Sequence, residues 1–128
     1  MKKYKPEGHN SLSPYLVVKD APRLVKLLKE IFGATEQRRY DRADGSIMHI
    51  ELKLDDSILM ISDSTSDYPP NTTMLHIYVP DVFKTFETAL EKGCEPVERP
   101  VNKPGDPDTR GSFNDYAGNS WWVSSQTE

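Results

Sequence analysis

The chain contains one local pattern twice, and this repeat restricts its fold more than any other feature. Residues 16–20 (LVVKD) and 77–81 (IYVPD) are short apolar segments ending in V-x-D, and their aspartates are 61 residues apart. A helical pattern of apolar residues follows each segment and ends at a glycine, Gly33 or Gly93. Since two repeats of about 60 residues leave little of the chain over, the sequence predicts one module present twice.

Each module is expected to form a strand, a helix and three further strands. In the first module these elements are expected at 13–18, 21–32, 36–41, 47–54 and 57–62. In the second they are expected at 73–79, 82–92, 96–99, 111–115 and 120–124. The side chain of Asp20 is expected to cap the first helix, and Gly33 to end it.

The order βαβββ, repeated, predicts an α+β protein in which a helix covers one face of each sheet. We expect a single domain over residues 1–128, made of module 1 (about 12–63), a connector (64–72) and module 2 (about 73–125). The curved mixed sheets of the two modules are expected to form a cavity.

Composition argues against several classes of protein. The formal net charge is −4, and no cluster of Lys and Arg interleaves with aromatics, so nucleic acid is not an expected partner. No segment approaches the ~18–20 apolar residues of a membrane span, and residues 1–10 lack the apolar region of a signal peptide. The single cysteine, Cys94, cannot form an internal disulfide and is expected to be a packed thiol, which favours a cytoplasmic location.

Alternation along the strands assigns side chains to the two faces of each sheet. Residues expected to face the helices include Leu16, Met48, Ile50, Phe113 and Trp121. The opposite faces are expected to carry Tyr15, His49, Glu51, Met60, Ser62, Met74, His76, Tyr78, Arg110, Ser112, Asn114, Ser120 and Trp122. Solvated strands more often carry Lys, Glu and Thr than Trp and Met, so this set is expected to line the cavity.

Seven segments of the chain carry a resemblance to a known family. They are 14–20 (PYLVVKD), 31–34 (IFGA), 44–52 (DGSIMHIEL), 59–63 (LMISD), 78–81 (YVPD), 110–112 (RGS) and 115–121 (DYAGNSW). In these segments the chain resembles the vicinal oxygen chelate superfamily (glyoxalase I, bleomycin-resistance proteins, extradiol dioxygenases), and within it the PhnB-like branch. The resemblance implies paired βαβββ modules; it does not specify an activity, because one fold hosts many chemistries.

The resemblance also implies a divalent metal held by four side chains, one from each of four strands. In this sequence the corresponding positions are Ser13, Met60, Met74 and Trp122. Neutral Ser, Met and Trp side chains do not hold a hard or borderline divalent ion. We therefore expect no classical metal site and no cofactor.

His49, Glu51 and His76 are the candidate catalytic residues. They could hold a divalent metal at a displaced site, or act as acid and base groups without one. In the simpler alternative, His49 pairs with Glu51, or Glu51 pairs with Arg110, as a polar network in the cavity wall.

The remaining candidates are ligand-binding residues. Arg110 could hold a carboxylate or phosphate, or be a solvated arginine. Tyr15, Tyr78 and Trp122 could stack on a planar ligand, or fill the space that a metal and substrate occupy in relatives. The other members of the set are Met60, Ser62, Met74, Ser112 and Asn114, whereas His9 is expected to have no role.

Two classes of function fit these features. The first is a glyoxalase/bleomycin-resistance-like protein that binds a small planar or anionic molecule in an aromatic-lined cavity. The second is an enzyme of lyase, isomerase or dioxygenase type that uses displaced metal ligands or the acid/base groups His49, Glu51 and His76. A homodimer is expected in both cases, with modules paired within a chain or exchanged between chains.

Overall fold

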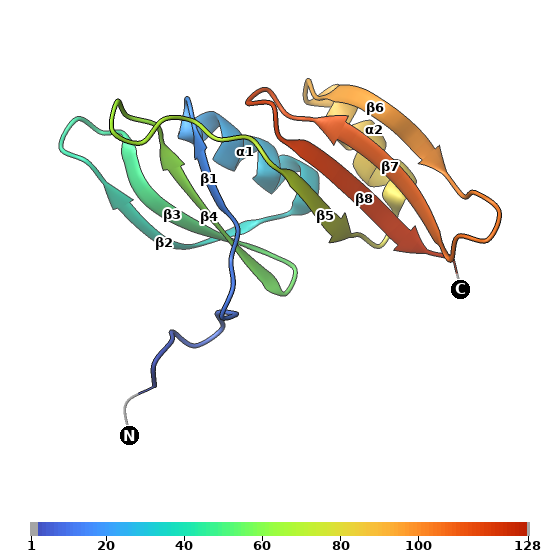
Figure 1. Cartoon of the computed structure of the whole chain (residues 1–128), viewed down its shortest axis with the longest axis horizontal. Helices are drawn as coiled ribbons and strands as arrows, with labels where there is room; N and C mark the ends of the chain where they lie inside the picture. Colours follow the sequence, from blue (N-terminus) through green and yellow to red (C-terminus); the bar gives the residue numbers. More distant parts are fainter. Residues whose placement is uncertain (1–2, 128) are drawn as a thin grey trace.

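The computed structural model describes residues 3–127, which form two four-stranded sheets, each with one helix (Figure 1). The first module contains β1 (Tyr15–Val18), α1 (Ala21–Phe32), β2 (Thr35–Asp41), β3 (Ile47–Leu54) and β4 (Ser57–Asp63). The second contains β5 (Met74–Tyr78), α2 (Val82–Glu91), β6 (Glu95–Val101), β7 (Asp108–Asn114) and β8 (Ser120–Gln126). The strand orders, β1-β4-β3-β2 and β5-β8-β7-β6, are equivalent, which confirms the α+β fold of two βαβββ modules.

The start of α1 differs from the prediction. Asp20 adopts a left-handed backbone conformation (φ 56°), and its side chain makes no capping hydrogen bond. The carboxylate of Asp63, at the end of β4, instead accepts the backbone N–H groups of Ala21 and Ile47, both at 2.7 Å. A residue distant in sequence therefore accepts a hydrogen bond from a backbone N–H in the first turn of the helix, which has no partner within the helix. The predicted end is confirmed, because Gly33 (φ 67°) donates its N–H to the carbonyl of Lys29.

The second helix begins in a similar way. The hydroxyl of Ser125, on β8, accepts the N–H of Val82 at 3.0 Å. Here the V-x-D aspartate also caps the helix, since the carboxylate of Asp81 accepts the N–H of Lys84 at 3.1 Å. Each helix thus begins at a polar side chain on the last strand of its own module.

One apolar core extends through both modules. The helix-facing residues Leu16, Ile50, Phe113 and Trp121 are buried, as predicted. The ring of Phe32, at the end of α1, lies 6.3 Å from that of Phe113 and 5.1 Å from that of Trp121, measured between centroids. The first helix therefore contributes to the core of the second module and joins the two.

The prediction for Met48 is wrong, because this side chain is 49% exposed. Asp41 pairs with Ile47, whereas Tyr40 pairs with His49, so Met48 is an extra residue in β3. Such a bulge interrupts the alternation of faces. Ile47 consequently occupies the buried position that the strict alternation gave to Met48.

The two sheets lie side by side, with β1 and β5 toward the middle and both helices on one side of them (Figure 1). We call the face of each sheet that is turned away from its helix the open face. The two open faces lie next to each other in one chain. No helix in the described range is long and apolar enough to cross a membrane.

Candidate functional site

A buried carboxylate organises the open face of the first module. Glu51 is only 3% exposed and lies between two imidazoles. Nε2 of His49 is 2.8 Å from one carboxylate oxygen, and Nε2 of His9 is 2.7 Å from the other. The hydroxyl of Tyr15 lies 2.9 Å from Nδ1 of His49. The four side chains form one continuous hydrogen-bonded chain.

These contacts determine where the protons lie. An ionised carboxylate only accepts hydrogen bonds, so Nε2 of each histidine must donate to Glu51. In neutral His49, Nδ1 then accepts the hydroxyl proton of Tyr15. Burial opposes ionisation of Glu51, but the hydrogen bonds from His49 and His9 outweigh it and hold the pKa of this carboxyl below its usual value.

The pairing of His49 with Glu51 agrees with one of the two alternatives weighed from the sequence. The expectation that His9 has no role is wrong, because its ring is almost buried against Glu51. Arg38 also approaches, with Nε 3.9 Å from Oε1 of Glu51. No local pattern could reveal His9, since it lies outside the regular elements and reaches Glu51 only through the path of the arm before β1.

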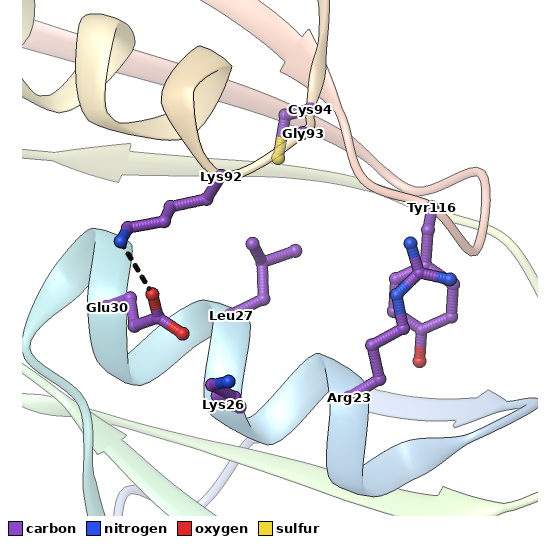
Figure 2. Close-up of a pocket in the computed structure, with 8 residues that line it drawn as sticks. All are labelled: Arg23, Lys26, Leu27, Glu30, Lys92, Gly93, Cys94 and Tyr116. Atoms are coloured by element: carbon purple, nitrogen blue, oxygen red, sulfur yellow. Dashed lines mark ion pairs between the residues drawn. The ribbon is translucent and has the colours of Figure 1, made fainter.

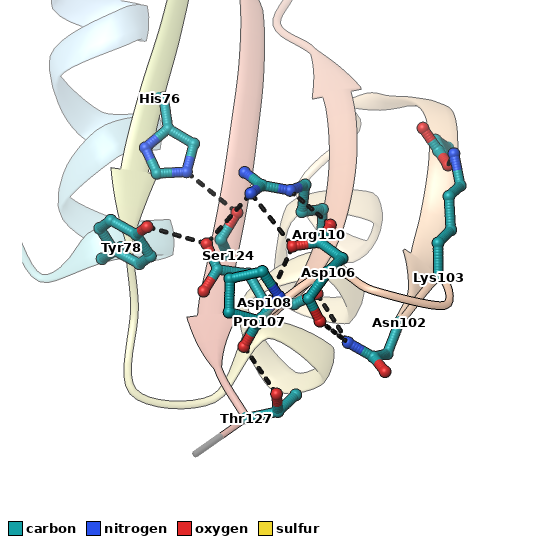
Figure 3. A network of polar contacts seen from close by, with 11 residues as sticks. His76, Tyr78, Asn102, Lys103, Asp106, Pro107, Asp108, Arg110, Ser124 and Thr127 are labelled. Atoms are coloured by element: carbon teal, nitrogen blue, oxygen red, sulfur yellow. Dashed lines mark hydrogen bonds and ion pairs between the residues drawn. The ribbon is translucent and has the colours of Figure 1, made fainter.

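A second polar network lies on the open face of the second module (Figure 3). Arg110 donates from Nε to Asp106 at 2.8 Å, and its Nη2 lies 3.2 Å from Asp108. Asp108 also accepts the hydroxyl of Tyr78 at 2.8 Å. Arg110 therefore pairs within its own module and does not pair with Glu51.

The pKa shifts in this network follow from its contacts. The hydrogen bond from Arg110 holds the pKa of Asp106 below its usual value. The hydrogen bond to Asp108 raises the pKa of Tyr78, so this hydroxyl stays protonated. Burial, together with the charge of Arg110, lowers the pKa of His76, whose Nε2 is 2.9 Å from the hydroxyl of Ser124. His76 is thus a neutral ring near neutral pH.

The other predicted ligand-binding residues are distributed over both open faces. Met60 pairs with Tyr15 and Glu51, and Trp122 pairs with His76 and Ser112. The exposed fractions are 41% for Tyr15, 59% for Tyr78 and 70% for Met74, whereas Met60, Asn114 and Trp122 are half-buried and Ser62 and Ser112 are buried. The hydroxyl of Ser112 has no hydrogen-bond partner within residues 3–127.

The donor set does not fit a divalent metal at the classical positions. Ser13 and Met60 line one hollow with Glu51, while Met74 and Trp122 lie on the other module. None of the four offers an anionic or imidazole donor. In the range that the structure describes, no three His, Cys, Asp or Glu side chains are placed to hold a metal ion. The structure brings His49 and Glu51 together, and His76 stands apart on β5.

Comparison with known proteins agrees with this architecture. The sequence model of the Glyoxalase/Bleomycin resistance protein/Dioxygenase superfamily matches residues 10–123. An uncharacterized protein of Mycobacterium bovis is 29% identical over an alignment of 95 residues that covers 66% of this chain and 62% of that protein. The chain thus spans less than two thirds of this curated relative.

Two solved structures have a similar fold. TioX from Micromonospora sp. ML1 has a TM-score of 0.77 at 22% identity, with 91% of this chain and 98% of that chain covered. TnmS3 from Streptomyces sp. CB03234, an antibiotic binding protein, has a TM-score of 0.70 at 18% identity, with 93% and 100% covered. With the family match over most of its length, the chain belongs to the glyoxalase/bleomycin resistance protein/dioxygenase superfamily.

Proposed function

We propose that this chain binds a small planar molecule on its open faces without the classical metal site. The observation that supports this most directly is the exposure of Met74 and Tyr78 on the strand next to the half-buried Trp122, and of Tyr15 on the open face of the first module. Large apolar side chains gathered on one surface mark interaction sites more often than chance exposure. Aromatic rings suit planar ligands because they offer apolar area with fixed geometry.

The relatives support the same class of function. One protein of similar fold, TnmS3, is an antibiotic binding protein. We propose a related role for this chain, in binding or sequestering a small molecule. The segments DGSIMHIEL and LMISD further support a place in the PhnB-like branch of the superfamily.

The charge of the open face narrows the choice of ligand. Arg110 is compensated by Asp106 and Asp108, so this part of the face carries two carboxylates for one guanidinium. A free anion would gain little from an arginine that is already paired. We therefore propose that a neutral or cationic planar ligand binds better than an anionic one.

The open faces also support the proposal of a homodimer. In a single chain they lie side by side (Figure 1), and the arm before β1 covers the first face at Glu51, whereas Tyr15, Met74 and Tyr78 stay exposed. A second copy placed over them would enclose the ligand between sheets and bury the exposed tyrosines. Sedimentation velocity of the purified chain tests the homodimer. A chain that stays monomeric at micromolar concentration would contradict it.

Calorimetric titration with planar probes of different charge tests the binding proposal. We expect saturable binding of the cation proflavine and of neutral phenazine, and weaker binding of anthraquinone-2-sulfonate. Because aromatic contacts contribute about 1 kcal/mol, Trp122→Leu should weaken proflavine binding by about fivefold. Tyr68→Leu, an exposed aromatic on the connector, is the matched control. Equal affinity in wild type and Trp122→Leu would refute a site at Trp122.

One observation favours an enzyme as the second candidate function. The chain Tyr15–His49–Glu51 has the logic of a catalytic triad, in which a buried carboxylate orients an imidazole that accepts a hydroxyl proton. In the other form of this candidate enzyme, His49 binds a metal ion at a site away from the four classical positions. Elemental analysis tests the metal-dependent form: stoichiometric metal that disappears in His49→Ala would contradict the metal-free binding protein.

A further inference from the structure

A second hollow lies on the helix side of the molecule, away from the open faces (Figure 2). It has a volume of about 280 Å³ and lies at the junction of the modules. One wall is α1, and the other is formed by the turn after α2 and the turn between β7 and β8. The residues that matter for its chemistry are Arg23, Lys26, Leu27, Glu30, Lys92 and Tyr116.

The hollow is positively charged in a chain whose net charge is −4. Of its three cations, only Lys92 is paired, with Nζ 2.9 Å from the carboxylate of Glu30. Arg23 and Lys26 form no ion pair with any residue in the described range. Arg23 and Lys26 therefore have no carboxylate of residues 3–127 in direct contact, and Lys26 acts on Glu30 only at longer range.

The guanidinium of Arg23 is held in place by an aromatic ring. Its central carbon lies 4.2 Å from the ring centroid of Tyr116, and the two groups overlap in Figure 2. The ring is itself fixed, because its hydroxyl donates to the backbone carbonyls of Lys19, at 2.9 Å, and Asp20. A stacked guanidinium keeps its N–H groups at its edge, where they can bind two oxygens of one anion.

The floor of the hollow is apolar and uncharged. Leu27 lies at its centre and is half-buried (Figure 2). Burial, with a smaller effect of Asp115, raises the pKa of the Cys94 thiol to about 11. Cys94 therefore stays a neutral thiol that neither repels an anion nor reacts as a nucleophile.

We propose that this hollow binds a small organic anion, with a phosphate or carboxylate group attached to a short aromatic or aliphatic body. Arg23 and Lys26 bind the anionic group, and Leu27 and the ring of Tyr116 contact the body. Both modules contribute to the walls, so a bound anion also stabilises their junction. The site is independent of the function proposed for the open faces.

Titration with phenyl phosphate, followed by amide chemical shifts, tests this site. We expect saturable chemical-shift changes at Gly93, Cys94 and Tyr116. Inorganic phosphate should bind more weakly because it lacks the apolar body. Benzoate should bind with comparable affinity because it carries both an anionic group and an apolar body. Since hydrogen bonds to charged groups contribute about 1.5–3 kcal/mol, Arg23→Gln should weaken phenyl phosphate binding about tenfold or more. Lys29→Gln, on the same helix but outside the hollow, should leave it unchanged.

Three outcomes would overturn the proposal. One is the absence of saturable shifts with both phenyl phosphate and benzoate. Another is an equal loss of affinity in Arg23→Gln and Lys29→Gln, which would indicate diffuse attraction to a basic helix. The third is loss of phenyl phosphate binding in Trp122→Leu, which would place the anion on the open face. Failure of proflavine binding would refute the proposed function and leave this site unaffected.

Discussion

The two modules share a backbone but carry different chemistry at equivalent positions. Glu51 lies opposite Met60, and Ser112 lies opposite Trp122, so Glu51 and Ser112 occupy matching places. In the first module this place holds a buried carboxylate with two imidazole partners. In the second it holds a buried hydroxyl without a partner among the residues described. The helix-facing residues form the buried core of both modules, whereas the residues of the open face differ between them.

A neighbouring pair of positions shows the same contrast. By the same register, His49 of the first module matches Arg110 of the second. His49 accepts a hydrogen bond from the Tyr15 hydroxyl and donates one to Glu51, whereas Arg110 donates two hydrogen bonds to Asp106 and forms an ion pair with Asp108. The first face therefore carries a chain of hydrogen bonds through imidazoles, and the second holds one guanidinium between two carboxylates.

The largest expected difference between the modules lies in their cores. Trp121 and Leu59 are buried at matching positions, and Trp121 also contacts the ring of Phe32 in the other module and donates its indole N–H to Asp115. We expect Trp121→Ala to lower the free energy of unfolding by about 4 kcal/mol, and Leu59→Ala by about 3 kcal/mol. Urea denaturation measures both. A larger loss for Leu59→Ala would contradict the role of Trp121 at the junction.

The helix starts provide a second, smaller contrast. Asp63 accepts two backbone N–H groups as a carboxylate, whereas Ser125 accepts one as a hydroxyl, and Asp81 supports α2 separately. We expect Asp63→Ala to cost about 2 kcal/mol of unfolding free energy, and Ser125→Ala about 1 kcal/mol. Equal losses in chemical denaturation would show that the two modules do not differ in this respect.

The smallest effect concerns the acid response of the first open face. Because the pKa of Glu51 is lowered in the folded state, its ionisation stabilises the fold above the unfolded pKa, and this contribution is lost as pH falls through the folded pKa. We expect Glu51→Gln to lose about 1 kcal/mol at neutral pH, because weaker hydrogen bonds replace charged ones.

The same variant should lose less stability than wild type on acidification from about pH 5 to pH 3. Thermal denaturation across this range measures the difference. Ser112→Ala, at the matching place in the second module, is the control and should keep the acid response of wild type. An unchanged acid response in Glu51→Gln would contradict the assigned network.

The sequence predicted the parts of the molecule that depend on neighbours along the chain. The helices ending at Gly33 and near Gly93 and the buried alternation through Leu16, Ile50 and Trp121 all follow from local periodicity. The pairing of His49 with Glu51 was also accessible, because residues two apart on a strand share a face. Met48 was misplaced because a single extra residue shifts the alternation, and a pattern does not show where a bulge occurs.

The sequence alone therefore determined two βαβββ modules and their apolar faces, and the family resemblance added four positions without metal-binding residue types. Only the tertiary structure decided which polar groups meet: His9 with Glu51, Asp63 with the start of α1, and Arg23 with Tyr116. The physical reason is that periodicity records the direction of a side chain relative to its own strand or helix. The partner of a charged group depends instead on how distant segments pack, and packing brings together residues that no local pattern connects.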